Sequence, residues 1–558
     1  MLFLGIVFPF LTTSLYAQDV LVVEPGVGTL NAAIAEHGGS KVYELKAGQW
    51  YQLDAIIEND GYHLQIIGED PGDGMPATLQ TNADATGAVF NKMFDAKGNL
   101  TLRNIYFVNA DLTGVVGERF MDQSGTDART IINNCVLHPA AWALAISLES
   151  GNNKLYFTDN LAIRHGHQLN PNCGHFFVTG HSGIGFDTLY VENNTFVSMG
   201  TNMHAGEFST IQHNFSKWNH NTIIHQKSQI DWASLENEYY WTNNLMFDVQ
   251  TQPWAVTWQP MPGHKPDRPQ PSLIYADTIP GEAMPSNRTQ FVQYNLHYRN
   301  PGFYALIDEL NNLAVELDKP KMYLMPLLWP EDSAEVSREV AFFHDDENFP
   351  KWKYGNTYYG VDPKFEDERI YQHSDWLVEW TRPASMQHAM GMSADEVPPT
   401  SEWAQWHWIP DDDISINETW PVFNGRYTNP DILTASIEGL PLGDLNWFPE
   451  AKAIWEKNKA AIDDHMRETN TERIDVTVSV QERPMVSPGV SVYPNPVRDV
   501  IRISQQADLV EVYNMTGSLL ISAKEVTQVN VTDLNNGIYL VRVLADSVMS
   551  THKVVIAK

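Results

Sequence analysis

Apolar and polar positions alternate in short segments of the chain, and six of these segments repeat one pattern around an asparagine between Leu100 and Gln250. Neighbouring asparagines of the pattern lie 30, 26, 34, 27 and 23 residues apart. Alternation with a period of two indicates β-strands, and a repeat of roughly 20–50 residues is typical of a solenoid, whose units bury their apolar faces by stacking. Stacked asparagines can also bond from coil to coil. The pattern therefore predicts a parallel β-helix. Its copies are LTLRNIYFV, TIINNCVLH, FTDNLAIR, VENNTFVS, WNHNTIIH and WTNNLMFD, aligned on Asn104, Asn134, Asn160, Asn194, Asn221 and Asn244.

This repeat resembles the right-handed parallel β-helix of the pectate-lyase-like superfamily, in which a turn asparagine recurs between two strands of each coil. The similarity is clear from Val20 to Asp248 and looser beyond it. It implies an all-β fold in which residues 18–445 form the β-helix, with loop insertions on further coils. Many activities are built on this fold, so the resemblance by itself implies no single reaction.

Segments outside the repeat predict the ends of the β-helix. Gly28 to His37 has helical spacing before a Gly-Gly stop, and two alternating stretches follow, which is typical of an N-terminal cap. A further helix is expected within Gly302–Leu317, and residues 356–365, NTYYGVDPKF, resemble a return to the coils. Residues 446–485 are expected to form a C-terminal helix, which closes the solenoid, and a polar linker.

Residues 486–558 contain short alternating segments, each bounded by Pro, Gly or Asn. They predict a small Ig-like β-sandwich of about seven strands. This segment resembles the C-terminal sorting domain of type IX secretion cargo in the order and spacing of its motifs. The resemblance implies that the type IX secretion machinery is a partner and that the protein is secreted or held at the outer cell surface. The matching residues are Tyr493-Pro494-Asn495-Pro496, Tyr513-Asn514-Met515-Thr516-Gly517, Gly537-Ile538-Tyr539 and Lys553-Val554-Val555.

Residues 1–17 form an apolar run that ends at Ala17, and we interpret them as a signal peptide. No later run reaches the roughly 18 apolar residues of a membrane span. The two cysteines, Cys135 and Cys173, are too few for a disulfide framework in a chain of 558 residues. A buried thiol at Cys135 is the favoured interpretation, and a disulfide is the alternative.

The net charge of −33 is concentrated in the first 485 residues, which hold 63 acidic and 30 basic side chains. Such a field repels nucleic acid, which excludes a nucleic-acid partner, and it favours solubility outside the cell. One window differs, because Leu161 to Ile230 holds three Lys or Arg, three Asp or Glu, and eight of the 19 histidines. The chain's one non-acidic face is expected in this window.

Positions one and three after each repeat asparagine are mostly apolar, as in Ile105 and Phe107, and are expected to point inward. Positions two and four would then point outward. Because stacked strands lie about 4.8 Å apart, the side chains at position four would form a column suited to an extended polymer. The residues of this column are Val108, His138, Arg164, Ser198, His225 and Asp248.

The fold resemblance implies β-elimination of a uronic-acid polymer as the leading hypothesis. That reaction needs a base, often Lys, Arg or His, and a cation that neutralises the carboxylate. The candidate catalytic residues are Arg164, His225, His138 and Lys227. The candidate substrate-binding residues are His165, His181, Trp241 and Trp254, the tryptophans because indole rings can stack on sugars. The alternative is that these residues are ordinary surface or core positions of a scaffold.

No metal ligand is assigned from the sequence. His165 and His167 form a His-x-His pair that could bind a metal together with His175, yet a further ligand at defined spacing is not established. Calcium stays open as a cofactor, since scattered acidic residues such as Asp187, Glu192 and Asp231 neither support nor exclude it.

These patterns predict a secreted protein that acts on an extracellular polysaccharide. A polysaccharide lyase is the first hypothesis, and a non-catalytic glycan-binding or adhesive surface protein is the alternative, so whether the chain is an enzyme stays open. A glycoside hydrolase comes third, because the paired-aspartate motifs of the β-helix polygalacturonases are absent from the sequence. The Arg-x-Pro-x-x-Arg pattern of pectate lyases is absent as well.

Overall fold

The computed structural model separates into two compact units, Met1–Val476 and Thr477–Lys558. It describes residues 19–557 except 73, 168–173, 180–182, 206–211, 228–235, 256–286, 325–341, 394–396, 398–422, 475, 477–491, 515–518 and 546–547. The expected signal peptide, residues 1–17, lies outside the described residues. The expected domain boundaries at residues 445 and 485 stay predictions.

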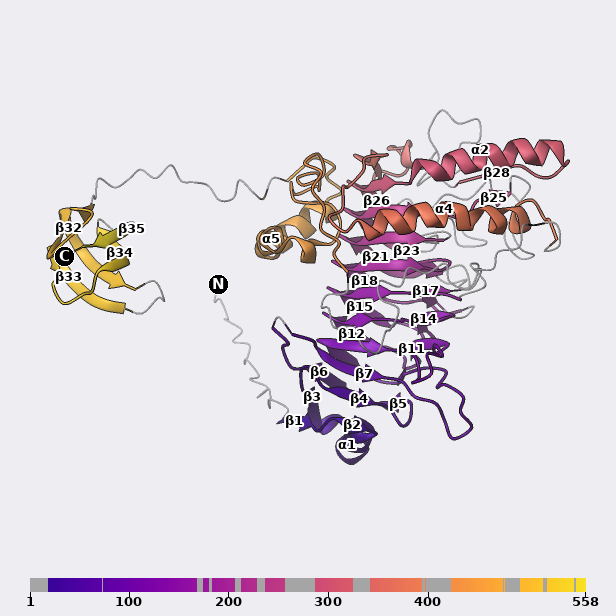
Figure 1. Ribbon diagram of the computed structural model, residues 1–558, viewed down its shortest axis with the longest axis horizontal. Coiled ribbons are helices and arrows are strands. Elements are labelled where there is room, and N and C mark those ends of the chain that lie inside the picture. Colours follow the sequence, from indigo (N-terminus) through magenta and orange to yellow (C-terminus); the bar gives the residue numbers. More distant parts are fainter. Residues whose placement is uncertain are drawn as a thin grey trace, which may run out of the picture. The chain divides into compact units, whose positions relative to one another are not determined.

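The first unit is a stack of parallel coils built from three sheets (Figure 1). Within the described residues, the first and second sheets have eleven strands each and the third has six. Each coil adds one strand to the first sheet and one to the second, and every neighbouring pair in these sheets is parallel, as in β12 with β9 and β15. The predicted parallel β-helix is confirmed.

The strand bounds follow the coils in chain order. The first sheet contains β1 (Asp19–Val23), β3 (Lys41–Leu45), β6 (Leu64–Gly68), β9 (Leu100–Arg103), β12 (Arg129–Asn133), β15 (Lys154–Thr158), β18 (Thr188–Glu192), β21 (His213–Asn219), β23 (Glu236–Thr242), β26 (Thr289–Gln293) and β29 (Trp352–Gly355). The second contains β2 (Gly26–Val27), β4 (Trp50–Gln52), β7 (Ala77–Gln80), β10 (Ile105–Val108), β13 (Val136–Leu137), β16 (Leu161–Ile163), β19 (Thr195–Met199), β22 (Thr222–Gln226), β24 (Leu245–Val249), β27 (Leu296–Tyr298) and β30 (Tyr358–Tyr359). The third contains β5 (Ile57–Glu58), β8 (Phe94–Ala96), β11 (Arg119–Gln123), β14 (Leu144–Leu148), β17 (His175–Thr179) and β20 (His204–Ala205).

One apolar cluster fills the interior of the β-helix from its first coils to its last. The strands supply it by alternation, as in β15, where Leu155 and Phe157 are buried and the residues between and beside them are partly exposed. A pleated strand sends successive side chains to opposite faces, so one face of each strand reaches this interior. The two-residue periodicity of the sequence therefore becomes a continuous core.

Asparagines stack in the turns between the first and second sheets, but the ladder begins later than predicted. The strand register pairs Asn133 with Thr158 and Val136 with Leu161, so Cys135 and not Asn134 occupies the position of Asn160. From Asn160 onward, each side-chain Nδ2 donates to the Oδ1 of the next asparagine at 2.9 to 3.2 Å. The ladder consists of Asn160, Asn194, Asn221, Asn244 and Asn295, the last of which the sequence repeat did not include.

Asn104 and Asn134 instead take the left-handed turn position one residue earlier, with φ of 57° and 52°. In the later coils this shift reverses which side chains point inward and which point outward, because a one-residue change of register exchanges the two faces of a strand. Ile105 and Phe107 point inward as expected, whereas Ala162 and Phe196, at position two, are the inward residues after Asn160 and Asn194. Positions one and three of the later coils face outward.

Outward apolar residues of the second sheet form a second cluster, which later parts of the chain cover. Leu161, Ile163 and Phe247 belong to it together with Phe365 and Phe423. The outward apolar side chains of this cluster are therefore covered, and this region is a packed layer where the sequence pattern predicted an open column.

Residues beyond Gln250 add two further coils, β26–β27 and β29–β30, as the sequence suggested. Helix α2 (Pro301–Glu316) matches the expected helix, and β30 matches the expected return to the coils. Helix α4 (Arg369–His388) was not predicted, and it packs on α2 in a third apolar cluster. Two short strands, β25 (Trp254–Ala255) and β28 (Met322–Tyr323), pair antiparallel beside these helices. At the N-terminal end, α1 (Thr29–His37) and η1 (Gly38–Ser40) form the expected cap.

Helix α5 (Pro449–Arg467) lies along the outside of the first sheet and does not close the solenoid, which corrects the prediction. The buried Lys217 ammonium donates to Asp463 of α5 at 2.7 Å and to Glu192 at 2.6 Å. Lys459 also pairs with Glu192. At the last coil, within the described residues, Phe343 packs on the buried Trp352.

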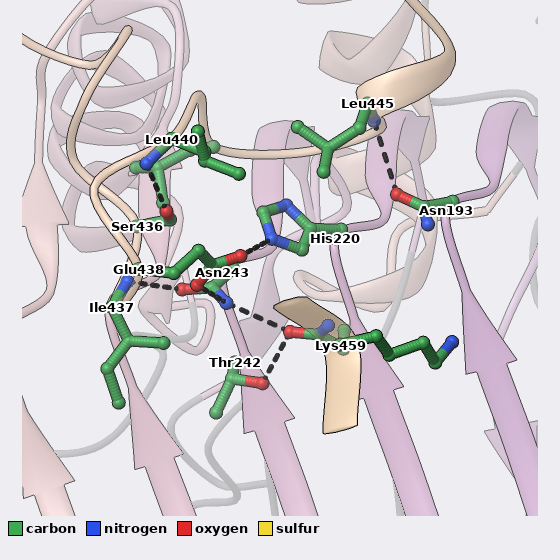
Figure 2. A network of polar contacts seen from close by, with 12 residues as sticks. Asn193, His220, Thr242, Asn243, Ser436, Ile437, Glu438, Leu440, Leu445 and Lys459 are labelled. Carbon is green, nitrogen blue, oxygen red and sulfur yellow. Dashed lines mark hydrogen bonds and ion pairs between the residues drawn. The ribbon is translucent and has the colours of Figure 1, made fainter. Parts of the chain in front are cut away.

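The segment before α5, with η3 (Leu445–Trp447), binds the turns between the first and second sheets (Figure 2). Asn243 donates to the buried Glu438 carboxylate at 3.0 Å and accepts from the Ile437 amide at 2.9 Å. The His220 ring contacts the other oxygen of Glu438. We call residues 436–467 the strap, because these bonds and those of α5 fasten it to the β-helix.

The second unit is a small antiparallel sheet with its own apolar cluster. In the described residues it has five strands, where about seven were expected. They are β31 (Val492–Tyr493), β32 (Val500–Tyr513), β33 (Leu519–Asn530), β34 (Gly537–Ala545) and β35 (Val548–Ile556). The C-terminal β domain predicted from the sequence is confirmed as a separate unit.

Candidate functional site

Four residues of the predicted column lie side by side at the end of the second sheet. The strand register places Arg164 next to Ser198, then His225, then Asp248. All four have left-handed backbone, with φ between 51° and 58°. Non-glycine residues hold this conformation only where the surrounding structure enforces it, and such residues cluster at functional sites. His138 aligns with Ile163 and so falls outside the column.

Helix α4 covers the later half of the column. His225 and Asp248 are fully buried there. The Ser374 hydroxyl donates to one oxygen of Asp248, and the Asn300 backbone amide donates to the other at 2.6 Å. The ring centroids of His373 and His225 lie 4.8 Å apart. Burial raises the pKa of the Asp248 carboxyl to about 6.

Lys227 lies under the same helix, with its Nζ 4.1 Å from the centroid of the Trp380 ring. Burial lowers the pKa of Lys227 well below its usual value, although Asp248 acts in the opposite direction. Burial also lowers the pKa of His225, with His373 and Lys227 contributing. Since both side chains are fully buried, a catalytic role for either requires α4 to move, and that role stays a prediction.

Three other candidates do not reach the surface. His138 is fully buried with its Nδ1 3.2 Å from the Tyr106 hydroxyl, and burial lowers its pKa to about 3. His165 is fully buried against Phe176, and Trp241 packs beside Trp218 in the interior core. Trp241 and the Phe176 ring beside His165 belong to the interior core, whereas His138 lies under the layer that covers the second sheet. The catalytic role expected for His138 and the substrate contacts expected for His165 and Trp241 stay predictions. His181 and the side chain of Trp254 lie outside the described residues.

A pocket of about 410 Å³ opens beside Arg164, at the uncovered end of the column. This volume lies within the range of roughly 300–1,000 Å³ that ligand pockets occupy. Residues from three successive coils line it, so it is a hollow between coils and not the mouth of a single loop. They are Thr113, Gly114, Val115, Val116, Pro139, Ala141, Trp142, Arg164, Gly166 and His167.

Among the described residues that line this pocket, Arg164 has the only charged side chain, and it is 7% exposed. Across the described part of the chain, no carboxylate pairs with its guanidinium. Burial lowers the pKa of Arg164. A buried charge without a partner is costly, and a bidentate carboxylate is the group that best satisfies a guanidinium. The pocket therefore has the electrostatics of a carboxylate site.

His167 and Trp142 share this pocket, with ring centroids 5.4 Å apart. The sequence suggested His167 only as a metal ligand, so its place beside Arg164 was missed. The Arg-His-Gly-His run was the available signal: after the inward-facing His165, the glycine at 166, with φ of 117°, turns the chain so that His167 lines the pocket.

No group of three or more His, Cys, Asp or Glu in the described residues is arranged to hold a metal ion. Of the acidic residues considered for calcium, Glu192 is bonded to Lys217 and Lys459, and Asp187 pairs with Lys154 at 3.2 Å. Asp231 lies outside the described residues. Cys135 is a buried free thiol, as favoured from the sequence, while Cys173 lies outside the described residues.

Comparison with known proteins identifies the second unit. Residues 491–557 match the secretion system C-terminal sorting domain family. Among solved structures, the chain is similar to a PL6-family alginate lyase, AlyGC, at 14% identity and a TM-score of 0.23. That match covers 42% of this chain and 36% of the enzyme, so the chain spans about a third of its length, and it carries no argument about activity. The comparison with curated protein sequences gives no match.

No helix among the described residues has the length and apolar character needed to cross a membrane. The sheet topology of the first unit and the sorting-domain match of the second agree with the two resemblances seen in the sequence. The chain is therefore a right-handed parallel β-helix protein with a type IX secretion sorting domain at its C-terminal end, and it is secreted or held at the outer cell surface.

Proposed function

We propose that this protein binds an acidic extracellular polysaccharide in the Arg164 pocket and cleaves it by β-elimination. The observation that carries the proposal is the buried Arg164 guanidinium, which faces the pocket without a carboxylate partner in the described residues. A uronate carboxylate would supply that partner. The exported address of the chain gives access to such polymers.

In β-elimination, a base removes the proton from the carbon next to the carboxyl group. The released electron pair forms a carbon–carbon double bond as the bond to the glycosidic oxygen breaks, and that oxygen leaves as a hydroxyl after taking a proton from water. Arg164 stabilises the negative charge that develops on the carboxylate. We assign the removal of the proton to His167, which lines the same pocket, since imidazole is a common general base.

A non-catalytic glycan-binding protein is the second candidate. It is supported by the apolar and neutral character of most pocket residues and by the burial of His225 and Lys227 beneath α4. Glycoside hydrolysis is less well supported, because it needs two carboxyl groups and none of the described residues lining this pocket is Asp or Glu.

The test is a screen of the purified secreted chain against polygalacturonate, alginate, ulvan and glycosaminoglycans. Near-ultraviolet absorbance of the new double bond and reducing ends are followed together. A parallel rise in both supports the lyase. Reducing ends without absorbance contradict β-elimination, and binding without either signal favours the glycan-binding alternative. An inactive chain that binds none of these polymers would overturn the proposal.

A further inference from the structure

Two loops on adjacent coils repeat the same sequence, and one of them forms a wall of the Arg164 pocket. Residues 82–90 read NADATGAVF and residues 109–117 read NADLTGVVG. Each follows a strand of the second sheet, the first after β7 and the second after β10, and leads to the third sheet. We call residues 84–88 the first hairpin and residues 111–115 the second hairpin.

Both hairpins are held by the same hydrogen bonds. In the first, Asp84 Oδ1 accepts from the Thr86 amide at 2.8 Å and from the Ala88 amide at 3.1 Å. In the second, Asp111 Oδ1 accepts from the Thr113 amide at 2.8 Å and from the Val115 amide at 3.0 Å. A glycine with φ of 84° follows the threonine in each. The two loops therefore share the same hydrogen-bonded structure.

The two hairpins begin and end at equivalent positions of neighbouring coils. At their start, the Gln80 side chain donates to the Ala110 carbonyl at 2.9 Å, and at their end the Arg119 amide donates to the Asn91 carbonyl at 2.8 Å. The next coil has no such hairpin, since its chain runs from Leu137 through Pro139 and Ala141 directly to β14. The pocket forms between the coil that has the second hairpin and the following coil, which has none.

The hairpins differ where their tips face solvent. Ala85 and Ala88 of the first correspond to Leu112 and Val115 of the second, whose exposed fractions are 64% and 51%. Side chains exposed to this degree bury little of their apolar surface within the fold, and grouped exposed apolar residues beside a pocket are typical of an interaction surface. Val115 itself lines the pocket. Of the two hairpins, only the second, which borders the pocket, has large apolar side chains at its tip.

We propose that the second hairpin determines which glycan binds, with Leu112 and Val115 contacting the apolar face of a sugar ring whose carboxylate lies on Arg164. This inference rests on the proposed function and assigns specificity to a loop that takes no part in the chemistry. A pyranose ring has one face of C–H groups, which suits contact with leucine and valine. A ligand whose charge is spread over both ring faces fits this wall poorly.

The first hairpin supplies a variant that is expected to fold. Leu112→Ala with Val115→Ala converts the second hairpin tip to the sequence DATGA, which the first hairpin already forms. The bonds from Asp111 are retained, so thermal unfolding is expected to match that of the unaltered chain. Val20→Ala with Val27→Ala, which removes two other exposed apolar residues, is the matched control.

The full chain and these variants are compared on whichever polyuronate the unaltered chain binds, by titration calorimetry and, if it is cleaved, by initial rates. The hairpin variant is expected to raise the dissociation constant or KM about tenfold with kcat unchanged, because it removes contact that is equal in ground and transition states. The Val20/Val27 control is expected to behave as the unaltered chain.

Unchanged affinity in the hairpin variant, together with lost affinity in Arg164→Gln, would overturn the hairpin inference and leave the proposed function standing. A fall in kcat alone would also overturn it, since the wall would then act on the chemistry. If the unaltered chain binds no polyuronate, the proposed function and the inference both fall.

Discussion

The ammonium group of Lys227 lies 4.1 Å from the centre of the Trp380 ring, and both side chains are buried at the contact between the second sheet and helix α4. A cation over an indole face is attracted to it, more strongly where water is excluded. This contact, with the Ser374 bond to Asp248, holds α4 on the β-helix.

Replacing Trp380 by alanine is expected to lower the free energy of unfolding by about 3–5 kcal/mol, the usual cost of removing a buried tryptophan. It also leaves Lys227 beside a cavity. Urea unfolding measures the change, and Tyr304→Ala, at a residue of α2 that is 50% exposed, is the control. A loss no larger than that of the control would show that α4 is only loosely held.

Arg164→Gln is expected to abolish binding of acidic glycans without unfolding the protein. The change removes the charge and the bidentate donor while keeping most of the side-chain volume, and it relieves an unpaired buried cation. Affinity for a uronate oligomer and thermal unfolding are measured on the same sample. Retained affinity would contradict the carboxylate site.

His167→Gln is expected to reduce kcat by about 10²–10⁴-fold, the range for loss of a general base, with little change in binding. His225→Gln should leave kcat unchanged if α4 stays in place during turnover. The reverse result, with His225→Gln inactive and His167→Gln active, would move the reaction beneath α4 and require that helix to open.

Glu192→Gln is expected to weaken attachment of the strap, and its effect depends on pH. Although burial acts to raise it, the pKa of Glu192 is lowered to about 2 by Lys217 and Lys459. A carboxyl whose pKa is lower in the folded state contributes stability above its unfolded pKa of about 4.5, and this contribution is lost as pH falls toward 2. The variant should therefore lose stability at pH 7, by roughly 3–5 kcal/mol, and much less at pH 2. Urea unfolding at both pH values measures the difference, and an equal loss at both would contradict the ion-pair explanation.

Binding of an acidic polymer is expected to become tighter as salt rises. The net charge of −33 repels a polyanion over long distances, and this repulsion is screened as the Debye length falls from about 10 Å at 0.1 M to about 3 Å at 1 M salt. The contact with the buried Arg164 is short-range and screened less. Titrations across this range check the sign, and weaker binding at high salt would show that the pocket charge dominates.

Cys135→Asn is expected to be tolerated or to stabilise the fold by about 1 kcal/mol. Cys135 occupies the ladder position, and its amide already donates to Asn160 Oδ1 at 2.9 Å. An asparagine there would extend the ladder by one coil, whereas Cys135→Ala offers no such bond and serves as the comparison. Equal thermal unfolding of the two variants would contradict the ladder register.

The fold was predictable because strand alternation and the asparagine repeat both report coil geometry. The register of the strands was harder to predict, because paired asparagines such as Asn133-Asn134 and Asn193-Asn194 allow two alignments. Only the strand pairing distinguishes the turn residue from the ladder residue. That single shift explains why Arg164 was placed in the column correctly while His138 was not.

The site could be predicted only in part. Arg164 was found because it stands out as a cation at a strand end, but the pocket beside it depends on a hairpin in one coil and the lack of one in the next. Helix α4 escaped prediction because Pro383 interrupts its sequence and its buried residues face other insertions. Burial of His225 and Lys227 follows from that helix, and so it could not be foreseen.

The strap links the ends of a long stretch of chain, with 246 residues separating Lys217 from Asp463. Coils can stack one after another as a solenoid grows, but Lys217 and Glu192 gain their strap partners, Asp463 and Lys459, only when that part of the chain is available. Contacts of such sequence separation form slowly, because the intervening loop must close first. The contacts between the strap and the β-helix are therefore expected to form late in folding, after nearly the whole first unit is available. Until they form, the later coils of an exported chain are held less tightly.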